Sequence, residues 1–498
     1  MTASTSTPDP AGARFAPSPD HARARVADGV VIALGALALY LLLGQETLYK
    51  TDGHYLMWRC LGDDIRHKWH FAYLPLLWLC KTAMLPLGFS IHQAGLALSA
   101  LGMALGVLGV HGAGCVLRLE RGPARWVSAL VATTPAVVFF GSVVEVHGPF
   151  FAMFGLASLV AAWLAVRPSL GRGALLGFAT GLAYAGHASG ILLPLVLLPV
   201  AAALALERGG ADRRLWAALI AAAVAHVGLV QLIPPVLRGL GFSVSSGEAF
   251  THFTHYLWDY GARPWLLLGT LWSDWLRPFA LLSAVLLAGP FARTTRWLAW
   301  AALPGLAALL SVTLILMGTE SERGAYLLPV AWPAALITAR LVTGPWRWGL
   351  LVVSCAITVG EVVAHNAAKP GLPFAQGVRE VIGDRPAYLL LGNSLDEAEG
   401  ALVYLPELEW GVPADQASLE PDVLREWLPV YDQHFLAPHL AAGKELWITQ
   451  GGREFLLDPL WVPGATAGPV ILEHLQQSYH WQEASAAGFH GWRLTPKP

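Results

Sequence analysis

Stretches of about 20 apolar residues recur along this sequence, and they constrain its fold more than any other feature. A bilayer core of about 30 Å is crossed by roughly 20 helical residues, so each stretch is a candidate transmembrane helix. Charged residues make up only 13% of the 498 residues, whereas about 25% is usual in water-soluble proteins. The sequence therefore predicts an α-helical polytopic membrane protein.

The basic residues at the junctions predict how the chain is threaded through the membrane. Short cytoplasmic loops are enriched in Lys and Arg. Arg14, Arg23 and Arg25 precede the first stretch, and arginines return at alternate junctions after it. We therefore expect the amino terminus inside and the carboxyl-terminal part outside the cytoplasmic (inner) membrane, with about eleven crossings. These lie near residues 28–46, 91–117, 126–142, 148–166, 173–187, 189–206, 215–235, 276–291, 297–317, 325–341 and 348–365.

Two further apolar stretches are interrupted by residues that do not suit a crossing. Residues 71–88 include Pro75 and Lys81, and residues 265–275 include Asp274. Proline disturbs helices and charged groups avoid hydrocarbon, so we expect both stretches to lie along the membrane interface.

The composition changes after Pro370, where charged residues become common. We expect a disordered cytoplasmic tail over residues 1–25, a membrane domain over 26–369 and a small extracytoplasmic α/β domain over 370–498. The elements expected in the last part are a buried strand at 387–392, a second strand at 445–449, helices from Asn393 and near 469–479, and a closing strand near 492–494.

The overall charge and the cysteines narrow the classes of partner. A net charge of −2 argues against a nucleic-acid partner, which would require a basic face. The four cysteines form no Cys-x-x-Cys pair, so the sequence predicts neither a zinc motif nor a disulfide framework. We therefore expect membrane lipids or lipid-linked molecules as partners.

Polar residues at the predicted outer junctions are the candidates for chemistry. Asp52 follows the first crossing, where a carboxylate is hydrated yet close to lipid head groups; an ordinary solvated acid is the alternative. Glu145 lies between Phe139–Phe140 and Phe150–Phe151, where an unpaired carboxylate would be costly. His187 lies in a predicted outer turn, where it could contact a substrate or cap a helix.

Three residues of the polar stretch after Arg238 have side chains that bind zinc or manganese. His252, His255 and Asp259 are spaced i, i+3 and i+7, which places them on one face of a helix. A surface amphipathic helix explains the same spacing without a metal ion.

Several short motifs follow one another in a recognisable order. They are the acid Asp52, His-x-x-Tyr-Leu-Pro (70–75), Glu-Val-His-Gly-Pro-Phe (145–150), Gly-His-Ala-Ser-Gly (186–190) and Arg-Gly-Ala-Tyr-Leu-Leu-Pro (323–329). This order resembles the GT-C superfamily of membrane glycosyltransferases, particularly the bacterial branch similar to protein O-mannosyltransferases. The resemblance covers roughly residues 28–345. His147 departs from it, because relatives often have Tyr there.

The resemblance implies transfer of a sugar from a polyprenyl-phosphate donor to an acceptor on the outer face of the membrane, with inversion at the anomeric carbon. An acceptor hydroxyl needs a general base, and polyprenyl phosphate leaves as an anion that needs positive charge or hydrogen-bond donors. We expect Asp52 to be the base and Glu145 to be a second catalytic residue. The expected substrate-binding residues are His70, Tyr73, His147, His187, Arg323, Tyr326, Arg66 and Lys68. Relatives differ in their use of a divalent metal ion, and we expect catalysis without one.

A transporter or flippase of a lipid-linked substrate is the main alternative function. Transporters usually place ionisable groups near the membrane midplane, and they often contain repeated halves. The predicted crossings hold few ionisable groups in their deep parts, and the sequence has no apparent internal repeat. A scaffold whose external domain binds partners is a third interpretation.

Overall fold

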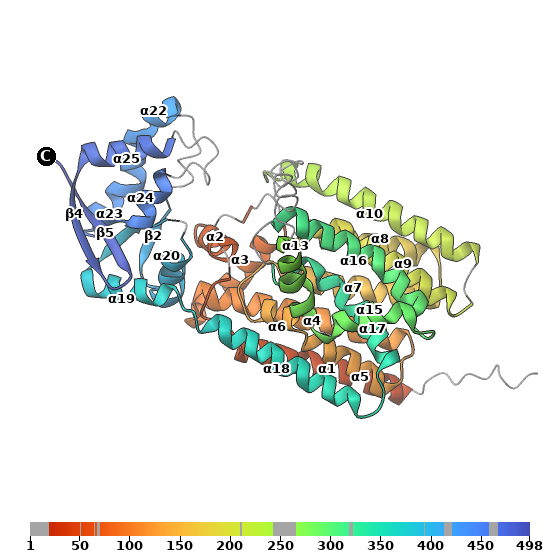
Figure 1. Ribbon diagram of the computed structural model, residues 1–498. Coiled ribbons are helices and arrows are strands. Elements are labelled where there is room, and N and C mark those ends of the chain that lie inside the picture. Colours follow the sequence, from red (N-terminus) through yellow and green to blue (C-terminus); the bar gives the residue numbers. More distant parts are fainter. Residues whose placement is uncertain are drawn as a thin grey trace, which may run out of the picture.

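The computed structural model describes residues 19–49, 51–63, 65–66, 70–209, 212–242, 265–317, 322–392, 394–412, 421–457 and 467–498. Most of these residues form a helical bundle, with a small sheet beyond one end of it (Figure 1). The helices of the first part are α1 (Pro19–Leu42), α2 (Thr51–Leu61), α3 (Tyr73–Met84), η2 (Leu85–Leu87), α4 (Ile91–Val116), α5 (Arg121–Ala132), α6 (Pro135–Gly141), α7 (His147–Val166), α8 (Leu170–Gly186), η3 (Ala188–Leu192), α9 (Leu193–Leu206) and α10 (Arg213–Gly239). They are followed by α13 (Trp265–Thr270), η4 (Leu271–Leu276), α14 (Arg277–Phe279), α15 (Leu281–Ala288), η5 (Gly289–Phe291), α16 (Arg296–Met317), η6 (Ala325–Val330), α17 (Ala331–Leu341) and α18 (Trp346–Asn366).

Within the described residues, seven helical segments are long and apolar enough to cross a membrane. They are Ala24–Leu42, Ile91–Val116, His147–Val166, Ala188–Leu206, Arg213–Gly239, Arg296–Leu314 and Trp346–Val381. Helices α5 and α6 make an eighth if they are counted as one span, although they meet at a bend of 60°. The protein is therefore a multi-pass membrane protein.

The expected count of eleven crossings is not confirmed, because four of the expected spans are short or broken. The span near 126–142 bends before Pro135, which lacks the N–H that would continue the helix. The span near 276–291 is interrupted at Ala280, whose φ is +43°. The other two correspond to α8, of 17 residues, and to η6 with α17. Hydropathy detected these apolar runs but not their backbone breaks.

Glycines allow the central helices α4 and α7 to pack backbone against backbone. A Cβ added to Gly102 would lie 2.2 Å from the carbonyl carbon of Gly148, and one added to Gly109 would lie 2.3 Å from that of Gly155. Small residues on facing helices are typical of association inside a membrane, where lipid supplies no hydrophobic driving force. This close pair forms the middle of the bundle and fixes the start of α7.

The junctions that we predicted to be cytoplasmic meet at one end of the bundle. Arg208, after α9, donates a hydrogen bond to the carbonyl oxygen of Leu117 at the end of α4 (3.1 Å). Arg340, near the end of α17, forms an ion pair with Glu207 (2.8 Å). The amino end of α1 lies at this end, and the sheet lies beyond the opposite end (Figure 1). The threading of the chain through the membrane, and which end of the bundle faces the cytoplasm, stay predictions.

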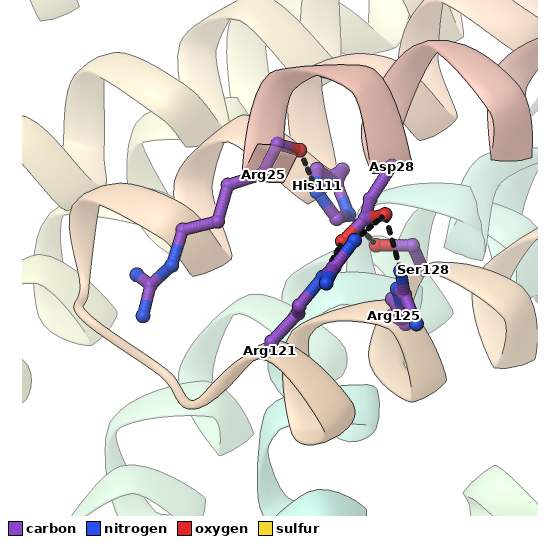
Figure 2. Close-up of polar contacts among 6 residues, drawn as sticks. All are labelled: Arg25, Asp28, His111, Arg121, Arg125 and Ser128. Atoms are coloured by element: carbon purple, nitrogen blue, oxygen red, sulfur yellow. Dashed lines mark hydrogen bonds and ion pairs between the residues drawn. The ribbon is translucent and has the colours of Figure 1, made fainter. Parts of the chain in front are cut away.

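An ion-pair cluster joins α1 to α5 (Figure 2). Helix α5 lies at the end of the bundle far from the sheet (Figure 1). The carboxylate of Asp28 accepts hydrogen bonds from Arg121 (2.6 and 2.9 Å) and also pairs with Arg125. Beside it, His111 of α4 is hydrogen-bonded to Ser128 of α5 (2.9 Å). One carboxylate thus lies between two guanidinium groups, and it connects the first helix to the rest of the bundle.

Asp28→Asn should lower the stability of the bundle, because two arginines would then face a neutral amide. Asp28 is only 8% exposed, but both arginines are about half exposed, so the expected loss is roughly 1–2 kcal/mol. Thermal unfolding in detergent measures it. Asp63→Asn is the control, since Asp63 pairs with Lys81 but is largely exposed. Equal losses in the two variants would contradict a special role of Asp28.

The carboxyl-terminal part contains a five-stranded mixed sheet in the order β2-β1-β3-β5-β4. Its strands are β1 (Ala387–Leu390), β2 (Glu409–Gly411), β3 (Glu445–Thr449), β4 (Tyr479–Ala486) and β5 (Phe489–Pro496). Its helices are α19 (Gly371–Val381), α20 (Leu395–Glu399), η7 (Gly400–Tyr404), α22 (Pro421–Tyr431), η8 (Asp432–Leu436), α23 (Ala437–Ala441), α24 (Gln450–Leu457) and α25 (Ala467–Ser478). The expected small sheet is present. Strand β1 runs parallel to its two neighbours, β2 and β3, whereas β5 runs antiparallel to its two neighbours, β3 and β4.

Both faces of β1 are buried, and the apolar run at 387–392 predicted a buried strand here. Leu389 packs in a core with Phe374 of α19, whereas the next residue, Leu390, packs in a second core with Leu424 of α22 and Ile471 of α25. Adjacent residues of a strand point to opposite faces, so a strand buried on both sides is apolar throughout.

The sheet-containing part packs against the bundle near α2. Leu48 and Leu56 share a buried cluster with Leu402 of η7. The indole of Trp58 stacks on that of Trp410 at 6.5 Å. The segment that precedes Asp52 therefore lies between the bundle and the carboxyl-terminal part.

Candidate functional site

The two predicted catalytic acids belong to backbone segments that touch. A Cβ added to Gly53 would lie 2.7 Å from the carbonyl oxygen of Val144, so only glycine permits this approach. Asp52 directly precedes Gly53 in the first turn of α2, and Glu145 directly follows Val144. The side chain of Asp52 lies outside the part of the chain that the structure describes.

Glu145 is buried and held against α4. The hydroxyl of Ser99 donates to its carbonyl oxygen (3.2 Å) and accepts from its backbone N–H (3.3 Å). One carboxylate oxygen accepts from the N–H of Val146 (2.7 Å). Burial raises the pKa of Tyr73 well above its ordinary value, and the nearby negative charge of Glu145 adds to this effect. Glu145 and Tyr73, both predicted site residues, thus lie close together.

Three predicted histidines form one buried stack of rings. The centroids of His70 and His187 are 5.0 Å apart, and those of His147 and His187 are 4.8 Å apart. Tyr326 completes the group at 5.5 Å from His187. These four residues come from the loop before α3, the start of α7, the end of α8 and η6, so the fold brings together positions spread over more than half of the chain.

His187 also has the capping role that we weighed as its alternative. Its Nδ1 accepts the backbone N–H of Ser189 (3.1 Å) and lies 2.7 Å from the Ser189 hydroxyl. A backbone N–H can only donate, so neutral His187 carries its proton on Nε2. The ring therefore both caps η3 and keeps one N–H donor within the stack.

The histidine stack predicts a loss of stability in acid. Burial lowers the pKa of His70 to about 4, whereas an exposed histidine titrates near 6.5. Between these values the unfolded chain binds more protons than the folded one, so stability falls as the pH falls through this window and is constant above it. At pH 5 the loss is about 2 kcal/mol for this histidine.

Thermal unfolding at pH 7.5 and pH 5 measures this effect, with His70→Gln as the comparison. The variant should lose less stability than the wild type on acidification. An equal loss in both proteins would contradict the assignment to His70.

Arg323 lies beside this stack, against aromatic rings. Its guanidinium carbon lies 4.5 Å from the centroid of Phe139 and 5.7 Å from that of Tyr49. It also lies 3.7 Å from the Glu361 carboxylate, which pairs with Arg277 as well. Because one carboxylate is shared by two arginines, it neutralises the charge of Arg323 only in part. The remaining positive charge can attract an anionic ligand.

Asp274 holds the loop that carries Arg323. It was not among the predicted site residues. It is fully buried, and one carboxylate oxygen accepts the backbone N–H groups of Glu322 (2.6 Å) and Gly324 (3.4 Å). Arg323 has a φ of +48° and Gly324 one of +78°. The carboxylate thus offsets the strain of this turn. An acid inside an apolar stretch was the signal, because buried acids in such stretches have partners.

Tyr49 was also not among the predicted site residues, although it precedes Asp52 by three residues. Its ring lies edge-on to Phe139 at 5.0 Å. Burial raises the pKa of its phenol well above the ordinary value; the charges of Glu322 and Glu145 raise it further and that of Arg323 lowers it. Tyr49 therefore lies among the acids and the arginine of the site.

The remaining predicted residues lie elsewhere or outside the described chain. Arg66 is exposed and donates to the carbonyl oxygen of Gly241 after α10 (3.4 Å). Lys68 and the metal candidates His252, His255 and Asp259 lie outside the described residues. Among the residues that are described, no three His, Cys, Asp or Glu side chains are grouped closely enough to hold a metal ion.

An apolar groove of about 370 Å³ begins next to the histidine stack. Phe71, which follows His70, lines it, and Ala72 is fixed there by its N–H bond to the carbonyl oxygen of Ala185 (2.9 Å). The other lining residues come from α8 and α10, and several of them are exposed on the outer surface of the bundle. The groove therefore lies on the apolar outer surface of the bundle, and its residues Phe71 and Ala185 are close in sequence to His70 and His187.

Comparisons with solved structures show which fold this chain has. No protein-family model and no curated protein matches this sequence. The crystal structure of ArnT from Cupriavidus metallidurans in the apo state matches with a TM-score of 0.50 and 14% identity, over 93% of this chain and 97% of that chain. This chain has the fold of ArnT. The motifs led us to expect both a fold and a function, and at 14% identity this similarity bears on the fold alone.

Two other solved structures are similar to a smaller degree. ArnT from the same organism bound to undecaprenyl phosphate has a TM-score of 0.49 and 13% identity, over 93% of this chain and 97% of that one. The arabinofuranosyltransferase AftD from Mycobacteria has a TM-score of 0.43 and 15% identity, over 94% of this chain and 40% of that one.

Proposed function

We propose that this protein is a glycosyltransferase that moves a sugar from a polyprenyl-phosphate donor to an acceptor on the outer face of the cytoplasmic membrane. The observation that supports it best is an apolar groove whose residues Phe71 and Ala185 lie close in sequence to a buried cluster of histidines. Glu145 and Arg323 belong to the same candidate site. A donor with a long apolar tail and an anionic head needs an apolar groove for the tail and polar or charged side chains for the head.

The tail of the donor would lie in the groove between α8, α10 and the residues just before α3. Burying isoprenoid carbon against apolar side chains gives the affinity, while the polar cluster selects the phosphate head. ArnT, whose fold this chain shares, has been crystallised with undecaprenyl phosphate. We take the same class of lipid as the donor carrier here.

In the reaction that we propose, Asp52 is the general base. The acceptor hydroxyl transfers its proton to the Asp52 carboxylate as its oxygen bonds to the anomeric carbon. The bond from that carbon to the phosphate oxygen breaks on the opposite face, which inverts the configuration. Polyprenyl phosphate takes the bonding electrons and leaves as an anion, and the guanidinium of Arg323 stabilises the charge that develops on it.

Glu145 and Tyr73 would orient the acceptor beside Asp52. The Tyr73 hydroxyl is fully buried, and it has no hydrogen-bond partner among the described residues. A buried hydroxyl without a partner costs about 1–3 kcal/mol, so a substrate hydroxyl that bonds to it recovers that energy. The neighbours of Glu145, Val144 and Val146, pack in one buried cluster with Tyr73, and in this proposal Glu145 accepts a second hydrogen bond from the sugar or alcohol.

Binding of undecaprenyl phosphate tests the groove. Leu232→Trp places a large ring in the groove, whereas Val224→Trp makes the same kind of change elsewhere on α10; both residues are more than half exposed. Native mass spectrometry should show about tenfold weaker binding for Leu232→Trp, which corresponds to ~1.4 kcal/mol, and unchanged binding for Val224→Trp. Equal binding by both variants would place the lipid elsewhere.

A further inference from the structure

A glutamate of the carboxyl-terminal part holds the segment that leads into the candidate active site. Glu399, at the end of α20, is fully buried. One of its carboxylate oxygens accepts the backbone N–H of Leu48, and the other accepts that of Gly371, each at 3.0 Å. Leu48 directly precedes Tyr49 and lies four residues before Asp52.

Neighbouring contacts bind the same segment to α18 and to the residues after it. The side chain of Asn366 accepts the backbone N–H of Glu46 (2.9 Å). The carboxylate of Glu46 also pairs with Lys369, and Gln45 is hydrogen-bonded to His365. The chain from residue 45 to residue 48 is thus fixed mostly by partners more than 300 positions later, rather than by α1.

A second buried glutamate of the same short helix provides a contrast. Glu397 accepts the N–H of Gly392 (2.8 Å), the hydroxyl of Thr449 (2.8 Å) and the N–H of Gly451 (3.0 Å). All these partners lie at the ends of β1 and β3, within the sheet. Glu397 therefore stabilises the carboxyl-terminal fold, whereas Glu399 two residues later reaches into the bundle.

We propose that Glu399 is a positioning residue for the active site, through which the carboxyl-terminal part sets the place of Tyr49 and Asp52. This inference rests on the proposed glycosyltransferase function. A carboxylate is needed because two N–H groups donate to its two oxygens, whereas the amide of Gln offers one oxygen and turns its NH₂ towards the other donor. Loss of this contact frees the Leu48 backbone, and a displacement of about 1 Å at a reacting group can cost 100-fold in rate.

The test compares Glu399→Gln with Glu397→Gln, which change the same group in the same buried helix. Donor turnover should show kcat lowered about 10- to 100-fold by Glu399→Gln with KM within about twofold, because the groove that binds the donor is untouched. Glu397→Gln should lower thermal stability but leave kcat of the folded fraction near the wild-type value. Equal effects on kcat in the two variants would overturn the inference.

Hydrogen exchange gives a readout that does not depend on activity. Peptides covering residues 43–57 should exchange faster in Glu399→Gln than in Glu397→Gln; unchanged exchange in Glu399→Gln overturns the inference even if the enzyme assay fails. A wild type without transfer activity would instead overturn the proposed function. If Glu399→Gln does not fold, Asn366→Ala removes the adjacent hydrogen bond to Glu46 and should show the same change in exchange, in smaller degree.

Discussion

Asp52→Asn is expected to abolish sugar transfer while the protein still folds in the membrane. An amide cannot accept the proton of an acceptor hydroxyl, and loss of a general base costs about 10²–10⁴ in rate. The backbone at this position touches the Val144–Glu145 segment through Gly53, and the substitution leaves that packing unchanged. Labelled-sugar transfer by purified protein measures the effect, and binding of undecaprenyl phosphate should be retained.

Asp63→Asn is the matched control for this prediction. Asp63 follows the same helix α2, is largely exposed and pairs with Lys81 at 2.8 Å. Its variant should keep nearly full transfer activity, because a surface ion pair contributes little. Full activity of Asp52→Asn, or an equal loss in both variants, would remove the general-base assignment.

Arg323→Gln should lower transfer by about 10²–10³, because the leaving phosphate would lose the cation that we propose stabilises it. The substitution keeps the left-handed turn, since Asp274 contacts the backbone of Glu322 and Gly324 rather than the arginine side chain. The loss should appear in kcat more than in donor binding, because charge on the leaving oxygen grows in the transition state.

Arg340→Gln controls for the loss of a partly buried arginine. The side chains of Arg323 and Arg340 are 30% and 28% exposed, and each pairs with a glutamate. Arg340 belongs to the opposite end of the bundle, so its variant should fold less stably but keep its turnover. If Arg340→Gln lost as much activity as Arg323→Gln, the effect would be one of stability and not of charge at the site.

Much of this architecture is predictable from local patterns. Long apolar runs predicted membrane helices, and the runs around Leu389 and Ile448 predicted the two strands β1 and β3, the first of them buried. The threading deduced from arginines placed His70, His147 and His187 on one side, and the structure stacks their rings. These features depend on hydropathy and charge, which a sequence displays directly.

Other features depend on contacts between distant residues, and these the sequence could not supply. The break at Ala280, whose φ is +43°, follows Pro278 by two residues, and hydropathy alone did not reveal it within the span predicted near 276–291. Arg66 has the right charge for a phosphate, but its side chain reaches Gly241 instead. In the sequence, Asp274 only interrupts an apolar stretch. The structure shows that its carboxylate binds the turn at Arg323, which lies 48 positions or more away in the chain. The strand β4, whose side chains are partly exposed, has too weak an apolar pattern to stand out.

The most direct test of the proposed function follows the bond between sugar and phosphate. Purified protein in lipid vesicles is given a polyprenyl-phosphate donor labelled in its sugar, with a cell-envelope extract as the source of acceptor. We expect the label to move to an acceptor while free polyprenyl phosphate appears in equal amount, and neither to occur with Asp52→Asn. Intact donor that crosses to the other leaflet with no bond broken would contradict this account and identify a transporter.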